Sequence, residues 1–309
     1  MDITAANLQI FFTGLNASFT QAYSQAETWA DKIAMTVPSS TELETYAWRD
    51  QIPAFRKWIG SRLVHNIPLR SRSVVNEDYE LTLTIPRNKF LDDKQGLFSM
   101  EAMDLGMRAA KLHDTNIANL ILSNPIGFDG VPFFSPSHLT NLDAATSALQ
   151  SNSLNLALSP TNYSAARAAM RSFKDRAGIP FGCRPSMLVV PPSLEEAGLN
   201  ILNADFFAPS LFGGGATVGA SDNKNLLKGS AELLVIDELE SQPKTWYLLD
   251  NKGMVKPFLK QVRQEASFQF LNNPTDPNLF FNREFIYGGD LRAGYDVTVW
   301  FKALRSVGP

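Results

Sequence analysis

The chain has 309 residues, of which 44% are hydrophobic and 19% charged, with a formal net charge of -3. This composition allows a sizeable core in one large domain or two ordinary ones. The weakly acidic balance argues against a protein that mainly coats nucleic acid, because lysine and arginine drive phosphate binding. The single cysteine, Cys183, excludes an intrachain disulfide. We expect a soluble intracellular protein without membrane contact, because no signal peptide is evident and no apolar run approaches the ~20 residues of a membrane span.

The first predicted element is an amphipathic helix near the N-terminus. Apolar side chains recur every three to four residues from Leu8 to Tyr23, and Thr4 precedes them as a candidate cap.

Residues 32–60 follow no single helical or strand period, and two prolines interrupt them. The segment concentrates the residue types that dominate interface energetics, namely Tyr46, Trp48, Arg49, Phe55, Arg56, Lys57 and Trp58. Such aromatic side chains must be covered by the core of their own subunit or by another molecule. Both alternatives stay open from the residues alone.

The next predicted elements are a strand and a long helix. Residues 79–85 alternate apolar and polar side chains, as in a half-buried strand that ends at Pro86. The polar residues 71–76 before it are a candidate tip or shoulder of a long hairpin. An apolar stripe over residues 95–122 predicts a helix about 42 Å long at ~1.5 Å per residue, ended by Asn124 and Pro125.

The remaining elements alternate irregularly, which indicates an α+β protein. Loops are expected over 127–152, with a short strand at 131–134, and over the glycine-rich residues 211–228. Helices are expected from Ser159 to near Gly178 and over 193–203, the second opened by a capping box at Ser193 and Glu196. Strands are expected at 186–190, 233–236, 245–249, 254–262, 267–271, 283–288 and 296–303.

The sequence offers no convincing catalytic, cofactor or metal site. His65, His113 and His138 share no metal-ligand spacing, and Cys183 has no identifiable base to activate it. Gly213 to Gly215 lack the Gly-Lys-Ser/Thr ending of a phosphate loop. The Ser221 loop overlaps two penicilloyl-serine motifs that belong on separate elements. The acidic pairs at 92–93 and 237–240 are interpreted as solvated surface. Together these negatives favour a structural protein over an enzyme.

Two blocks of short motifs stand out along the chain: Lys32-Ile-Ala-Met35, Tyr46-x-Trp48 and Trp58-Ile-Gly60 in the first, and Trp246-Tyr-Leu-Leu-Asp250, Val255-Lys-Pro-Phe258, Asn282-x-Glu284-Phe285 and Arg292-Ala-Gly-Tyr295 in the second. In these motifs, and over most of the chain, the sequence resembles the major head (capsid) subunit family of Mu-like bacteriophages. The match fades over 141–160 and 206–230.

The resemblance implies the tailed-phage major capsid fold, which is α+β and HK ninety-seven-like. It implies an N-terminal arm at 1–45, an extended hairpin loop at 46–86, a peripheral domain at 87–160 with a spine helix at 95–122, an axial domain at 161–262, and peripheral strands at 263–309. A separate scaffolding or protease partner is implied, because no scaffolding segment precedes the arm. No residues match a self-crosslinking pair.

The implied function is a major capsid protein that self-assembles in the host cytoplasm into the icosahedral phage head. Its partners would be copies of itself in hexamers and pentamers, a scaffolding protein, a portal, and packaged DNA bound non-specifically on the inner face. We expect Trp48, Phe55 and Trp58 to anchor on a neighbouring subunit, with Arg49, Arg56 and Lys57 as charge partners. Arg70 and Arg72 are expected at an inter-subunit salt bridge or on bare surface, ahead of a nucleic-acid contact. The alternatives are an encapsulin-like nanocompartment shell and, less favoured, a small-molecule enzyme using Cys183 or the Ser221 loop.

Overall fold

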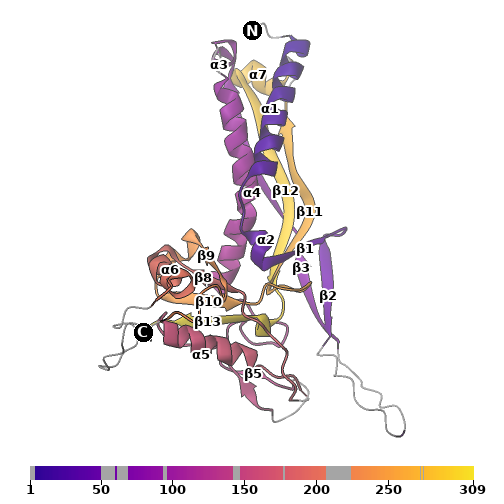
Figure 1. Cartoon of the computed structure of the whole chain (residues 1–309). Coiled ribbons are helices and arrows are strands. Elements are labelled where there is room, and N and C mark those ends of the chain that lie inside the picture. Colours follow the sequence, from indigo (N-terminus) through magenta and orange to yellow (C-terminus); the bar gives the residue numbers. More distant parts are fainter. Residues whose placement is uncertain are drawn as a thin grey trace.

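The computed structural model describes residues 4–49, 60, 69–92, 96–141, 147–176, 178–206, 224–271, 273 and 275–309. The chain folds into an elongated part and a broader body (Figure 1). In the elongated part, two long helices run beside two long strands. The body gathers the shorter helices and strands at one end of these elements.

The elongated part contains a four-stranded sheet in the order β1-β11-β12-β4. Its strands are β1 (Ala34–Pro38), β11 (Phe258–Phe270), β12 (Glu284–Val297) and β4 (Glu77–Pro86). Neighbouring strands run antiparallel except β1, which is parallel to β11. The sheet therefore joins segments from the start, the first third and the end of the chain.

Helices α1 (Ala5–Gln25) and α4 (Leu97–Ser123) pack with this sheet around a phenylalanine-rich core. The oxygen of the Thr4 side chain accepts a hydrogen bond from the Asn7 backbone, which confirms the predicted cap. The two helices approach closely at Gly106, where an added Cβ would lie 2.4 Å from the Phe19 carbonyl oxygen. The missing side chain at Gly106 is what permits this helix–helix distance.

The body contains a five-stranded sheet in the order β7-β13-β10-β8-β9. Its strands are β7 (Ser153–Leu154), β13 (Ala303–Val307), β10 (Thr245–Leu249), β8 (Met187–Val190) and β9 (Glu232–Val235). Helices α5 (Pro160–Arg171) and α6 (Glu195–Asn203) contribute to a second core with this sheet. Ile117 and Ile121 of α4 reach into this core too, so the long helix links the two parts.

Two further strand pairs and several short helices complete the described chain. The pairs are β2 (Leu43–Arg49) with β3 (Leu69–Val75), and β5 (His138–Leu139) with β6 (Leu149–Gln150). The short helices are α2 (Ala30–Ile33), α3 (Arg87–Asp92), α7 (Pro277–Asn282) and the 3-10 turns η1 (Pro192–Leu194), η3 (Asp237–Ser241) and η4 (Trp300–Lys302).

The predicted helices at 8–23 and 95–122 are confirmed with nearly the expected bounds, and so is the strand at 79–85. The expected strand at 131–134 is wrong, because only an isolated bridge between Ile126 and Pro132 forms there. The capping box is also wrong. Ser193 instead donates its hydroxyl to the Pro243 carbonyl, and α6 has no side-chain cap.

Four strand predictions near the C-terminus differ from the structure. The strands expected at 254–262 and 267–271 are one continuous strand, β11. The strand expected at 283–288 continues as β12 to Val297. The strand expected at 296–303 divides between the end of β12, the turn η4 and β13, and β13 lies in the body beside β10 rather than with the long helix.

Candidate assembly surfaces

The β2–β3 hairpin stands apart from the packed layers (Figure 1). Its strands pair antiparallel over seven positions, from Leu43 opposite Val75 to Arg49 opposite Leu69. A hairpin of two strands alone has marginal stability in water. It therefore requires contacts at its base, along its length, or both.

A buried polar cluster at the base fixes where the hairpin leaves the sheet. Asn76, between β3 and β4, is 4% exposed. Its amide nitrogen donates to the Ser39 hydroxyl and the Thr41 carbonyl, both at 2.8 Å. Gln261 of β11 donates to the Asn76 side-chain oxygen at 2.7 Å and accepts from the Tyr46 hydroxyl at 2.7 Å. The cluster thus ties both hairpin strands to the central sheet.

Arg72 on β3 makes the second attachment of the hairpin. Its Nη2 donates to Asp296 Oδ1 at 2.6 Å, its Nε contacts Asp296 Oδ2, and its Nη1 donates to the Ile126 carbonyl. A two-point pair of this kind fixes geometry as well as charge. Arg72 is therefore not a bare surface residue, since its guanidinium bonds within its own chain. The inter-subunit salt bridge expected for it stays a prediction.

Gly294 on β12 gives the hairpin room to cross the sheet. A Cβ there would lie 2.5 Å from the Val75 carbonyl oxygen and 2.9 Å from Val74 Cγ1. Sequence reasoning missed Asn76, Gln261, Asp296 and Gly294. A glycine within a strand pattern signals a close backbone approach, and it is the signal by which Gly294 could have been found.

The other predicted contact residues are described only in part. Trp48 and Arg70 lie opposite each other in the hairpin register, and Arg49 ends β2. The side chains of these three residues, and all of Phe55, Arg56, Lys57 and Trp58, lie outside the described residues.

The body holds an Asp–His pair that has the composition of an acid–base site. His138 Nδ1 lies 2.5 Å from Asp129 Oδ2, and the imidazole stacks on Trp300 with ring centroids 4.2 Å apart. Both side chains of the pair are almost fully buried, at 0% and 2% exposure. A substrate cannot reach them, so the pair has a structural role.

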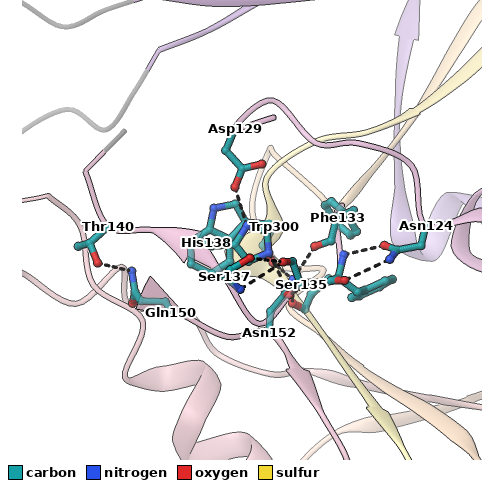
Figure 2. Close-up of polar contacts among 12 residues, drawn as sticks. Asn124, Asp129, Phe133, Ser135, Ser137, His138, Thr140, Gln150, Asn152 and Trp300 are labelled. Carbon is teal, nitrogen blue, oxygen red and sulfur yellow. Dashed lines mark hydrogen bonds and ion pairs between the residues drawn. The ribbon is translucent and has the colours of Figure 1, made fainter. Parts of the chain in front are cut away.

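Asn152 organises the residues around this pair (Figure 2). Its amide nitrogen donates to the carbonyls of Phe133, Trp300 and Ala303, at 2.8, 3.2 and 3.1 Å. Its oxygen accepts the Ser135 N–H at 2.8 Å and lies 3.1 Å from His138 Nε2. One side chain thereby joins the loop after α4 to the turn before β13.

The remaining chemical candidates are not arranged for catalysis. Cys183 is buried, and desolvation raises the pKa of its thiol to about 12, with Asp250 adding to the effect. A thiol with that pKa is inert as a nucleophile near neutral pH. The glycine cluster at 213–215, the Ser221 loop and His65 lie outside the described residues. The structure holds no group of three or more His, Cys, Asp or Glu suited to a metal ion within its described ranges.

His113 is a packed residue, with 7% of its surface exposed. Its Nδ1 lies 2.7 Å from the Tyr295 hydroxyl between α4 and β12. Burial lowers its pKa to about 4, and the positive charge of Lys260 contributes further. Among the described helices, none is long and apolar enough to cross a membrane.

Comparison with solved structures identifies the fold as that of tailed-phage major capsid proteins. The procapsid of bacteriophage JBD30 superposes with a TM-score of 0.61 at 21% identity, covering 99% of this chain and 76% of that chain. A virus-like particle from Pyrococcus furiosus superposes with a TM-score of 0.56 at 8% identity, covering 96% and 99%. At these identities the fold alone does not separate a phage head from another shell.

The sequence comparisons distinguish a phage head from another kind of shell. The family described as Mu-like prophage major head subunit gpT matches residues 8–159, 154–239 and 228–308. The major capsid protein of Escherichia phage Mu is 25% identical over 315 residues, covering 77% of this chain and all of that protein. The chain belongs to the Mu-like prophage major head subunit family. It is a major capsid protein of a phage head, a structural subunit used in many copies, and not an enzyme.

Proposed function

We propose that copies of this chain close into an icosahedral head shell around a double-stranded DNA genome, with each β2–β3 hairpin reaching over a neighbouring subunit. The observation that carries this proposal is the hairpin itself, which projects from the packed layers and is held at its base by Asn76 and Arg72 (Figure 1). Because the hairpin is anchored at its base, the direction in which it projects from the subunit is fixed. Obligate interfaces commonly bury more than ~2,000 Å², and arms that reach neighbours help to provide that area.

The contact residues proposed for this arm are Trp48, Phe55 and Trp58 as anchors, with Arg49, Arg56, Lys57 and Arg70 as their charged surroundings. Tryptophan and arginine are enriched among the side chains that dominate interface energies. Arg72 is left out of this set, because its donors are used within its own chain.

The proposed domains follow the two sheets. The peripheral domain contains α4 and the four-stranded sheet, and the axial domain contains the five-stranded sheet. The extended hairpin is then 43–75, because β4 pairs with β12 over ten positions. By the same reasoning β13 joins the axial domain.

Three further partners complete the proposal. A scaffolding or protease protein would guide assembly, a portal would replace one pentamer, and packaged DNA would meet the inner face without sequence preference. The net charge of -3 supports weak, non-specific contact with DNA over tight binding.

The proposal is tested by Trp58→Ala, with Trp58→Phe as the matched control. We expect Trp58→Ala subunits to stay soluble with unchanged far-ultraviolet circular dichroism and to form no shells in negative-stain micrographs. Trp58→Phe keeps an aromatic anchor and is expected to form shells. Shells of normal number and size from Trp58→Ala would contradict the proposal that Trp58 anchors the hairpin on a neighbouring subunit.

A further inference from the structure

The proposed axial domain, which contains the five-stranded sheet, has a concave basic surface at one end of β8 and β9. A cavity of about 700 Å³ is lined by Arg167, Arg184 and Lys252, and by one acid, Glu232. Glu232 is paired with Lys32 at 3.0 Å. Three cations against one acid leave a surplus of two positive charges on the lining, and Lys32 offsets the charge of that acid. The cavity is therefore suited to an anionic group.

The cations of this cavity differ in how they are held. Nη1 of Arg167 donates to the Pro185 and Ser230 carbonyls at 3.2 and 2.9 Å, which fixes the guanidinium in place. Arg184 and Lys252 are exposed and form no ion pair with any other described residue. Two exposed cations without an ion pair, beside one fixed cation, leave charge available for a partner.

The opposite end of the same strands is acidic. β8 and β9 are parallel, with Met187 opposite Glu232 and Val190 opposite Val235. Both strands begin at the basic cavity, and after both strands the chain turns into short helices that carry exposed carboxylates: Glu195, Glu196, Asp237, Glu238 and Glu240. Glu240 accepts the Ser193 N–H at 3.1 Å. Within the described chain, none of the five carboxylates is ion-paired.

The two ends are separated by the length of the strands, about 13 Å for four residues at ~3.3 Å each. An acidic end and a basic end on opposite sides of one body cannot satisfy each other within a subunit. They can do so between subunits in a head-to-tail ring, where each copy presents a different surface to each neighbour. Opposite charges across such a contact favour correct docking and disfavour the reversed orientation.

We propose that the basic cavity at the start of β8 and β9 binds the acidic end of the next copy in a ring of axial domains. The acidic end consists of Glu195, Glu196, Asp237, Glu238 and Glu240. This contact rests on the proposed shell function and specifies one interface within it. The occupant is a second copy of this chain, because the chain itself supplies a complementary surface at the far end of the same two strands.

The test is charge reversal at each end, alone and combined. Arg184→Glu with Lys252→Glu reverses the basic end. Asp237→Lys, Glu238→Lys and Glu195→Lys together reverse the acidic end, because two negative and three positive charges then stand where five negative charges stood. Each set is expected to lower the yield of shells at least tenfold while far-ultraviolet circular dichroism stays unchanged. The chain with all five substitutions has exchanged its charges and is expected to recover shells to within about threefold of the wild type.

Mixing the two reversed proteins gives a sharper outcome. One protein then has two acidic ends and the other two basic ends, so they can alternate only around rings with an even number of subunits. We expect the mixture to recover hexamers and not pentamers. Arg184→Gln with Lys252→Gln is a milder change and is expected to weaken assembly and its sensitivity to salt.

Four results would overturn the inference. One is normal shells from either reversed set, and another is a folded five-substitution chain no better than the two sets. The third is shells of normal yield that contain less DNA, which would assign the cavity to phosphate binding. Arg87→Glu with Lys89→Glu, an equal charge change on the exposed face of α3, is the control. An equal loss there would attribute the effect to net charge and reject the cavity. If the wild type forms no shells in the same preparation, the shell function fails and not this contact alone.

Discussion

Arg72→Met tests whether the Arg72–Asp296 pair holds the hairpin on the sheet. The substitution keeps an apolar stem of similar length and removes the bidentate pair. Asp296 is 8% exposed in its side chain and would retain the Val297 N–H as its hydrogen-bond partner. Breaking a fully buried pair costs roughly 3–5 kcal/mol. Because the Arg72 side chain is 24% exposed, water screens part of that cost, and we expect a loss of about 2–3 kcal/mol.

The loss is measured by urea unfolding of unassembled subunits and by hydrogen exchange of the β3 amides. A cost of about 2–3 kcal/mol corresponds to roughly 30- to 150-fold faster exchange through opening of the hairpin. Arg87→Met, on the exposed surface of α3, is the matched control. Asp296→Asn combined with Arg72→Met should cost less than the sum of the single changes, because it removes the unpaired carboxylate. Equal stability and exchange in Arg72→Met and Arg87→Met would refute the reasoning.

Three more predictions concern the two cores, all read by unfolding of unassembled subunits. Asn152→Ala removes the amide partner of three carbonyls and one N–H, of which the Trp300 carbonyl keeps the Ala303 N–H, and should cost about 3–5 kcal/mol; a loss below about 1 kcal/mol would contradict the role given to this side chain. Gly106→Ala places a Cβ 2.4 Å from the Phe19 carbonyl and should cost about 1–3 kcal/mol, whereas Gly14→Ala, with open space around it, should be neutral or stabilising. The folded-state pKa of His113, about 4, lies below its ordinary 6.5, so the unfolded chain binds the proton more tightly. Stability is therefore full above pH 6.5 and falls by about 3 kcal/mol toward pH 4 relative to His113→Gln; parallel pH curves for the two proteins would contradict this.

The helices and isolated strands could be predicted because each is specified by a local period. The stripe of α4 and the alternation of β4 need only their own residues to be recognised. The sequence predicts two strands in place of β11, because register shifts after Val262 and Gln264 interrupt the alternation of its side chains. β1 was missed because five residues are too few to show a period, and its pairing partner lies more than 200 positions away.

For the candidate surfaces, too, the contacts between residues far apart in the sequence could not be predicted. The family resemblance places Trp48 and Arg70 on one hairpin, whereas their register follows only from the strand pairing in the structure. The partner of Arg72 could not be predicted, because Asp296 becomes its neighbour only after β12 joins β4 and the hairpin crosses at Gly294. A charged residue in a polar stretch gives no sequence signal of a partner so distant along the chain.

The most direct test of the central claim is sedimentation velocity of the expressed chain, with and without its scaffolding partner, followed by negative-stain imaging of the fastest fraction. A capsid subunit is expected to give megadalton particles with closed, evenly sized outlines. A single species near the 34.2 kDa of one chain that never assembles, even with phage partners present, would contradict the account.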